Sequence, residues 1–131
     1  MAAAGLEINN VFEQTANFDR AEAMDLMQQF LGTGVNFDAV VANNDEMAIG
    51  AFEAMRAVGI TDIPVVGVDA NPDGCASIAA GEMMGSSFQD AGGQGAGAVD
   101  LAIAAARGEN YRIINWIPFQ WVTIANVDQF S

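Results

Sequence analysis

The sequence predicts an α/β fold, with an open, mostly parallel sheet flanked by helices in three layers. Short apolar runs recur at 40–42, 63–68 and 85–88, and each is followed by a polar turn and a segment with helical spacing. Strands that alternate with helices in this way form parallel sheets, whose strands are buried on both faces. A chain of 131 residues is long enough to bury a core of its own, so we expect one domain.

The composition favours a globular protein over a disordered one, since 52% of residues are hydrophobic and only 16% are charged. With 17 acidic and 4 basic residues the formal net charge is -13, which disfavours binding to nucleic acid or anionic membrane by repulsion. Cys75 is the only cysteine, so no internal disulfide can form. No apolar run approaches the ~20 residues that a membrane-spanning helix requires.

The first elements are a strand and a helix. Apolar and polar residues alternate from Leu6 to Phe12, which predicts a strand. Asp19, with Glu22 three residues later, has the spacing of a helix-capping box, and Gly32 provides the stop. The apolar positions of this helix are Ala23, Met24, Met27, Phe30 and Leu31.

The stretch 37–50 is central to the prediction. It begins as a strand buried on both faces and turns polar at 43–46, where Asn43 and Glu46 have capping-box spacing. The helix that follows is predicted to end at Gly59. Its apolar face contains Ala48, Phe52, Met55 and Val58.

The remaining elements repeat this pattern. A buried strand at 63–68 leads to a short helix from Pro72 to Ala80, and a weaker strand at 85–88 precedes a long Ala-rich helix, clearest over 96–107. Residues 111–124 are expected to be extended and interrupted by Pro118, with a short helical end at 126–130.

Three polar residues are predicted to meet at one edge of the sheet. Asn44, Asp69 and Gln89 each follow a parallel strand, and ligands bind at the carboxyl ends of such strands. Amides and a carboxylate suit a neutral polar ligand, and the Phe18 ring suits the C–H face of a sugar. On the pattern alone each residue also has a structural interpretation: Asn44 as a helix cap, Phe18 as a core residue or hydrophobic staple, and Gln89 as loop surface.

Catalysis, metal binding and cofactor binding receive little support. The chain has no histidine, so a Ser-His or Cys-His pair is absent. The run Asp69-x-Asn71-x-Asp73-Gly74 resembles half of a calcium loop, but its twelfth position is Ala80. Gly93-x-Gly95-x-x-Ala98 follows the last parallel strand rather than the first, where a dinucleotide fingerprint belongs. We therefore predict no enzyme, no cofactor and no metal; paired carboxylates at Asp45 and Asp69 are the remaining catalytic alternative.

Four segments together resemble the C-terminal part of a periplasmic sugar-binding protein of the ribose/galactose-binding type, which serves ABC importers. They occur in the family's order and spacing, and the resemblance covers about residues 6–130. The segments are Asn17–Arg20, Ala42–Ala51, Ile63–Gly74 and Phe88–Asp90.

The resemblance implies a sugar site in which Phe18 stacks on the ring and Asn44, Asp69 and Gln89 hydrogen-bond its hydroxyls. Glutamine at position 89 is similar to ribose binders, which favours a pentose or a related polyol. The implied partners are a small sugar and a membrane permease, and the implied location of the full-length parent is the periplasm. The alternative is the effector-binding domain of a sugar-responsive transcription regulator, although 61–65 is similar to the transport proteins.

The resemblance also implies an incomplete lobe. Residues 1–131 are expected to form one domain that corresponds to most of the C-terminal lobe, with 111–131 as the hinge-return segment and tail. The N-terminal lobe, a signal peptide, and the first strand and helix of this lobe are expected to be lacking. Half of a two-lobe site is expected to bind weakly or not at all. We also expect unpaired strand edges to pair with a second copy of the chain.

Overall fold

The computed structural model describes residue 5 and residues 7–130, so the start at residues 1–4, together with residues 6 and 131, lies outside the described residues. A four-stranded sheet with the order β1-β2-β3-β4 forms its centre. The first three strands are parallel and the fourth is antiparallel to β3, which confirms the mostly parallel α/β fold. The strands are β1 Val40–Val41, β2 Val65–Asp69, β3 Gly85–Phe88 and β4 Gln120–Val122.

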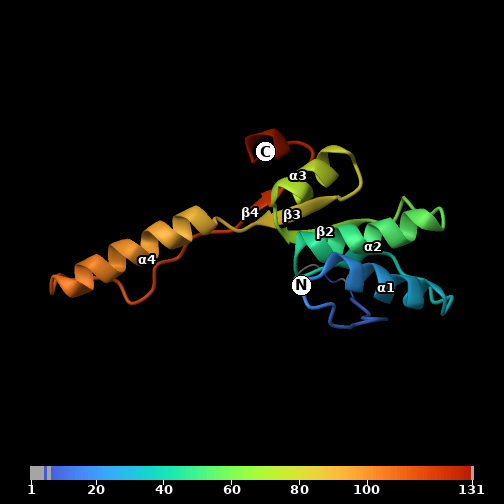
Figure 1. Cartoon of the computed structure of the whole chain (residues 1–131), viewed down its shortest axis with the longest axis horizontal. Coiled ribbons are helices and arrows are strands. Elements are labelled where there is room, and N and C mark those ends of the chain that lie inside the picture. The colour runs from blue at the N-terminus through green and yellow to red at the C-terminus, as the bar shows by residue number, and fades with distance from the viewer. Residues whose placement is uncertain (1–4, 6, 131) are drawn as a thin grey trace.

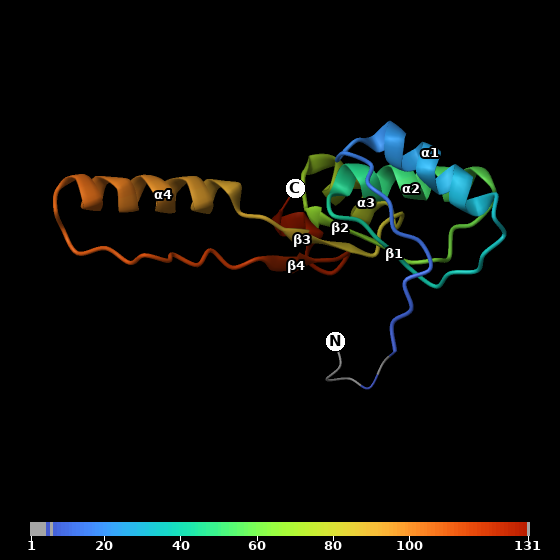
Figure 2. The same cartoon turned by 90° about the horizontal axis from the view of Figure 1, so that it is seen from below.

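Three helices lie together on one side of this sheet: α1 Arg20–Leu31, α2 Asp45–Ala57 and α3 Pro72–Ala79 (Figures 1 and 2). Helix α1 packs along α2, and α2 packs on β2. The core between these layers is centred on residues with almost no exposed surface, namely Ala48, Met55, Val65, Ile78 and Val122.

The helix starts follow the local signals closely. The Asp19 side chain accepts a hydrogen bond from the Glu22 N–H at 2.9 Å, as the spacing predicted. Helix α2 is capped by Asn44 rather than by Asn43, because the Asn44 Oδ1 accepts from the Met47 N–H at 2.9 Å. Gly59 has a φ of 84° and follows the end of α2. Val58, the last residue of the predicted apolar face, is the C-cap of α2 and is 63% exposed.

The predicted strand at Leu6–Phe12 is wrong for residues 7–12, which have no regular secondary structure. A strand needs a neighbour for its backbone N–H and C=O groups, and β1 pairs only with β2 within the described residues. Phe12 nevertheless makes a tertiary contact, since its ring stacks on Phe30 of α1 with centroids 4.7 Å apart.

Strand β1 is shorter and more exposed than predicted. Only Val40–Val41 pair with β2, and Val41 is 78% exposed. The prediction that this strand is buried on both faces is therefore wrong at Val41, whereas Val65 on the adjacent strand is fully buried in the core.

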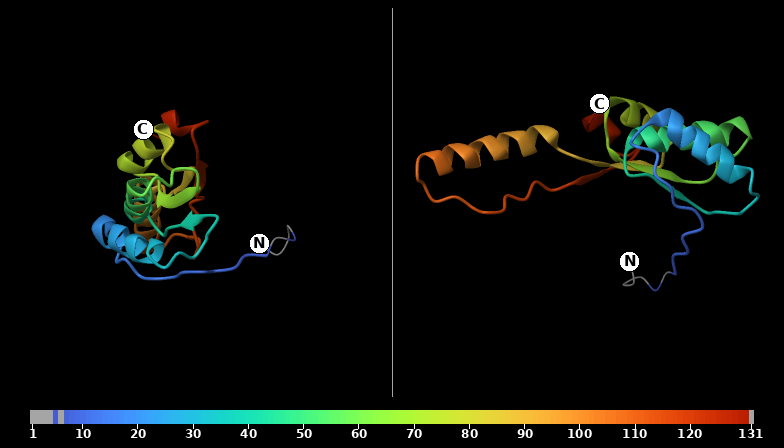
Figure 3. Two further views of the ribbon diagram at one scale, coloured as in Figure 1. Left: turned by 90° about the vertical axis from the view of Figure 1, so that its right-hand side faces the viewer. Right: turned by 60° about the horizontal axis from the view of Figure 1, so that its bottom comes forward.

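The long helix α4 Ala91–Ala106 projects away from the sheet, and residues 107–119 return beside it (Figures 1 and 3). We call residues 91–119 the arm and the other described residues the body. No residue of α4 is buried. The helix starts five residues before the clearest part of its pattern, because Asp90 caps it by accepting from the Gly93 N–H at 2.8 Å.

The chain ends on the body with the 3-10 helix η2 Val127–Gln129, as expected for a short helical end. Val127 is buried there, and the Phe130 ring packs against Phe88 with centroids 5.0 Å apart. None of the helices in the described part of the chain is long and apolar enough to cross a membrane.

Candidate ligand-binding site

The carboxyl edge of the parallel strands carries three of the predicted site residues. Asn44 lies between β1 and α2, Asp69 is the last residue of β2, and Gln89 directly follows β3. The register pairs Asp69 with Phe88, and the Gln89 N–H donates to the Asp69 carbonyl at 3.2 Å. The parallel topology therefore places the three residues at one edge, as predicted.

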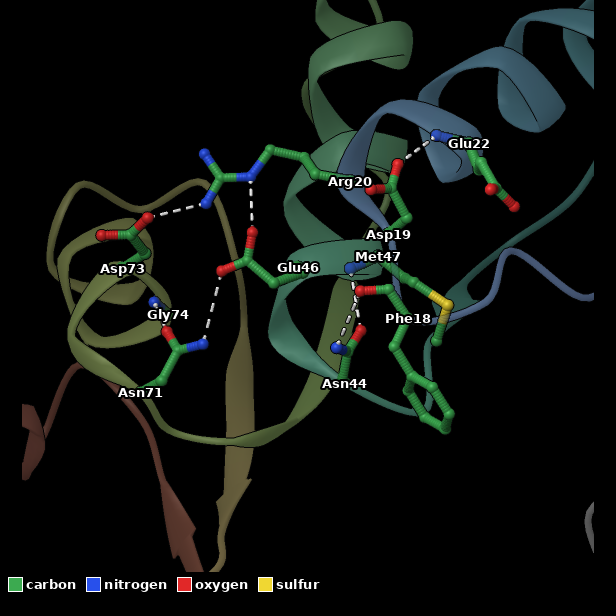
Figure 4. A network of polar contacts seen from close by, with 10 residues as sticks. All are labelled: Phe18, Asp19, Arg20, Glu22, Asn44, Glu46, Met47, Asn71, Asp73 and Gly74. Atoms are coloured by element: carbon green, nitrogen blue, oxygen red, sulfur yellow. Dashed lines mark hydrogen bonds and ion pairs between the residues drawn. The ribbon is translucent and has the colours of Figure 1, made fainter.

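Phe18 joins this edge from the loop before α1. Its backbone carbonyl accepts a hydrogen bond from the Asn44 Nδ2 at 3.4 Å. Asn17 and Phe18 both have left-handed backbones, with φ of 49° and 60°, which non-glycine residues adopt at a cost of about 1–2 kcal/mol. The Phe18 side chain is 66% exposed, so the interpretation as a core residue was wrong. Figure 4 shows its ring pointing away from the neighbouring ion pairs.

Asn44 is a structural cap as well as a candidate ligand contact. It is buried, and its amide is held at both ends by the Met47 N–H and the Phe18 carbonyl. A side-chain amide has two N–H donors and two acceptor lone pairs. One donor and one lone pair are used by these contacts, so the group keeps capacity for one further contact of each kind.

The Asp69 side chain differs from that of Asn44 because it is not held by hydrogen bonds from the described part of the chain. No hydrogen bond to its carboxylate occurs within the described residues, although the residue is half-buried. Burial raises the pKa of this carboxyl. Its backbone is held in the left-handed region, with a φ of 110°, and the next residue, Ala70, has a φ of 49°. An acceptor group held in this way suits the hydroxyls of a ligand.

Asp45 is fully buried, and both of its carboxylate oxygens accept hydrogen bonds from the protein. The Ser86 hydroxyl donates to its Oδ1 at 2.6 Å, and the Asn71 N–H donates to its Oδ2 at 2.9 Å. Burial raises the pKa of the Asp45 carboxyl, while these hydrogen bonds oppose the shift. Because ligand and water cannot reach it, Asp45 does not form an accessible catalytic pair with Asp69.

Gln89 is half-buried and contacts the arm. Its Nε2 donates to the Oε1 of Gln94 on α4 at 3.1 Å. Gln94 also lines a small cavity of about 190 Å³ between α4 and the returning segment, together with Leu101 and Asn115. Gln89 therefore lies where the body meets the arm.

A network of ion pairs, which was not predicted from the sequence, lies beside the site. Arg20 at the start of α1 donates to Glu46 of α2 at 2.9 Å and to Asp73 of α3 at 2.7 Å (Figure 4). These contacts raise the pKa of the Arg20 guanidinium. The only sequence signal is that all three residues lie in the first turns of helices that follow the candidate edge.

The same network uses two side chains of the calcium-like run. Asp73 is paired with Arg20, and Asn71 caps α3 by accepting from the Gly74 N–H at 2.8 Å. Within the described residues, no group of three acidic, cysteine or histidine side chains is arranged to hold a metal ion.

The sequence of this chain matches one known protein family over most of its length. The model of the periplasmic binding protein domain matches residues 1–110. The chain belongs to this family. The resemblance inferred from the four sequence segments is thereby confirmed, and periplasmic binding proteins of this kind are transport components rather than enzymes.

Curated relatives cover almost the whole chain. A putative rhizopine-binding protein of Rhizobium meliloti is 48% identical over 97% of this chain and 41% of its own length. The ribose import binding protein of Salmonella typhimurium is 36% identical over 82% of this chain and 36% of its own. The chain thus spans about two fifths of the length of these periplasmic binding proteins.

Solved structures agree in fold over the same extent. An ABC transporter solute-binding protein from Bacillus halodurans with bound myo-inositol is 46% identical, with a TM-score of 0.86 over 93% of this chain and 42% of that one. The Caulobacter myo-inositol binding protein, bound to myo-inositol, is 33% identical, with a TM-score of 0.85 over 98% of this chain and 45% of its own.

Proposed function

We propose that this chain contributes the sugar- or polyol-binding edge of the solute-binding component of an ABC importer. One observation carries the proposal: Asp69 presents a carboxylate without a hydrogen-bond partner in the described residues, at the edge that also holds Asn44 and the exposed Phe18 ring. Phe18 covers the C–H face of the ligand, while Asn44, Asp69 and Gln89 bind its hydroxyls.

The ligand is a small polyhydroxylated molecule. Relatives 46% and 33% identical hold myo-inositol, and relatives 36% and 32% identical are named for ribose and xylitol. Glutamine at position 89 supports a pentose, whereas the two bound structures support a cyclic polyol. We therefore place myo-inositol first and ribose second in the ligand panel.

The cellular context follows from the same relatives. One is named a ribose import binding protein, and another, from Haemophilus influenzae, a D-galactose/methyl-galactoside binding periplasmic protein. We propose that the parent protein is periplasmic and delivers its ligand to a membrane permease. Within it, residues 1–131 correspond to most of the C-terminal lobe, and 111–131 include the segment that returns across the hinge, which the extended path beside α4 supports.

Calorimetric titration with myo-inositol and with ribose tests the site. Asp69→Asn should weaken binding by about 10-fold or more, because a hydrogen bond to a charged group is worth about 1.5–3 kcal/mol. Asp62→Asn is the matched control, since Asp62 is exposed and precedes the same strand at its other end. If the unmodified chain binds a ligand and Asp69→Asn binds it with the same affinity, this site is refuted.

We propose in addition that a second copy of the chain covers the arm and the unpaired strand edges. The arm contains two acidic and two basic residues, so its net charge is zero and the rest of the chain carries all of the -13. Repulsion between two copies is therefore weakest at the arm, where Ile113 is 94% and Trp116 is 83% exposed.

Light scattering at several concentrations tests this association. A dimer is expected, and Ile113→Asp should convert it to a monomer because it places a charge on the apolar surface. Ile8→Asp is the control, since Ile8 is also exposed, at 63%, but lies outside the arm. A monomer at every concentration for the unmodified chain would contradict the proposal.

A further inference from the structure

We propose that Asp45 and Ser86 are positioning residues, which fix the backbone after Asp69 and thereby the direction in which its carboxylate points. This inference rests on the proposed role of Asp69 in binding the ligand. Asp45 and Ser86 lie on α2 and β3, on either side of β2 in the chain, and both are fully buried. They act through Asp69 rather than by touching a ligand.

The hydrogen bonds form one continuous chain. The Ser86 hydroxyl donates to the Asp45 Oδ1 at 2.6 Å and accepts from the Ala70 N–H at 3.0 Å. The other oxygen of Asp45 accepts from the Asn71 N–H at 2.9 Å. The two backbone N–H groups that follow Asp69 are thus both anchored to a single buried pair of side chains.

The backbone at this point needs such an anchor. Asp69 and Ala70 have φ values of 110° and 49°, a region that residues with a side chain seldom adopt. Conformations of this kind persist only where the surroundings hold them, and they concentrate at functional sites. Releasing the two N–H groups would let the backbone relax and turn the Asp69 carboxylate away from its present direction.

The anchor itself cannot move easily. Gly67 of β2 and Gly74 of α3 pack directly against the Asp45 side chain, so that a Cβ at either position would overlap it. Within the described residues no cation pairs with the Asp45 carboxylate, and its hydrogen bonds only partly offset the loss of water on burial. Asp45 is also adjacent to Asn44, so the start of α2 supplies both a candidate ligand contact and the anchor for a second one.

Hydrogen exchange of single amides, measured by NMR without ligand, tests the anchor directly. In Ser86→Ala the Ala70 amide should exchange about 10-fold faster or more, because its acceptor is gone. Ser86→Thr keeps a hydroxyl and should restore slow exchange. The Ala42 amide, which donates to the Val66 carbonyl at 2.9 Å, is the internal control and should not change. Unchanged exchange at Ala70 would overturn the proposal.

A double-mutant cycle on ligand affinity tests the link to Asp69. Ser86→Ala should raise the Kd for the ligand about 10-fold in the unmodified chain, but less than about twofold in the Asp69→Asn background. Additive losses would show that Ser86 does not act through Asp69 and would overturn the proposal. Asp45→Asn, which keeps the shape of the side chain, is the second variant if Ser86→Ala fails to fold, and the same non-additivity with Asp69→Asn is expected.

The two measurements separate this inference from the proposed function. If the unmodified chain binds a sugar and Asp69→Asn leaves that binding unchanged, the proposed site is refuted. The exchange rates of Ala70 still decide whether the anchor exists, because they require no ligand. Faster exchange in Ser86→Ala with restoration in Ser86→Thr is the result expected.

Discussion

The body and the arm show two different ways in which a helix is kept in place. Helix α2 of the body has eight buried residues and lies between α1 and the sheet, whereas α4 of the arm has none. Helix α4 depends on local signals: the Asp90 cap, a run of alanines, and a stop at Gly108 with a φ of 67°. Most helices in proteins are stabilised by tertiary packing, so the arm should be the weaker region.

Charge separates the two regions in the same way. The body carries the whole net charge of -13, and its two basic residues, Arg20 and Arg56, are both in ion pairs. In the arm, Arg112 forms no ion pair within the described residues, and Arg107 reaches Glu109 only at 3.8 Å. The arm is therefore neutral and apolar, while the body is acidic and well packed.

Tryptic digestion should show the largest difference between the two regions. The chain has no lysine, so its four arginines are the only tryptic sites. At concentrations low enough for the chain to be monomeric, cleavage after Arg107 and Arg112 should be at least about 100-fold faster than after Arg20 and Arg56, because cleavage in the body requires opening of packed helices. Mass spectrometry of early time points checks the order of cleavage.

The control for this digestion is the double variant Arg107→Gln and Arg112→Gln, which should leave the body resistant. An early cut after Arg56 would show that the body opens as readily as the arm, and would remove the distinction between them.

One substitution made in both regions should have opposite effects. Gly50 of α2 packs against the backbone of α1 so closely that a Cβ would overlap the Arg20 carbonyl, whereas nothing lies within 4 Å of the corresponding position at Gly95 of α4. Gly50→Ala should reduce the free energy of unfolding by about 1–3 kcal/mol through overpacking. Gly95→Ala should stabilise α4 by about 0.5–1 kcal/mol, because alanine has the higher helix propensity.

Urea unfolding followed by far-UV circular dichroism measures both effects. A loss of stability in Gly95→Ala comparable with that in Gly50→Ala would mean that α4 is packed against another surface in solution.

Local signals in the sequence were sufficient for much of the fold. The cap at Asp19, the stop at Gly59 and the alternation of strands with helices depend on neighbouring residues, and the structure contains all of them. The rule that parallel strands end at one edge placed Asn44, Asp69 and Gln89 together. The strand at Leu6–Phe12 failed because a strand requires a partner from elsewhere in the chain, and alternation does not supply one.

The finer features of the site depend on distant residues, and a single sequence does not display those contacts. Arg20 meets Glu46 and Asp73, which lie 26 and 53 positions away. Ser86 meets Asp45 across 41 positions. The exposure of Phe18 follows from a left-handed turn at two non-glycine residues, for which the sequence around Asn17 gives no clear signal.

The smallest expected effect is the pH dependence that one buried carboxyl adds to the stability of the body. Burial raises the pKa of Asp45 in the folded chain, so between its ordinary pKa and the raised value the folded state binds more protons than the unfolded state. The free energy of unfolding should therefore fall as the pH rises through this window, and level off above it. Urea titrations across the acidic range should show a smaller decline in Asp45→Asn, which has no carboxyl at this position.

Asp100→Asn is the control, because Asp100 is exposed on α4, and its decline should match that of the unmodified chain. If Asp45→Asn and Asp100→Asn decline equally, the buried carboxyl does not titrate with folding and the contrast between body and arm does not extend to their charges.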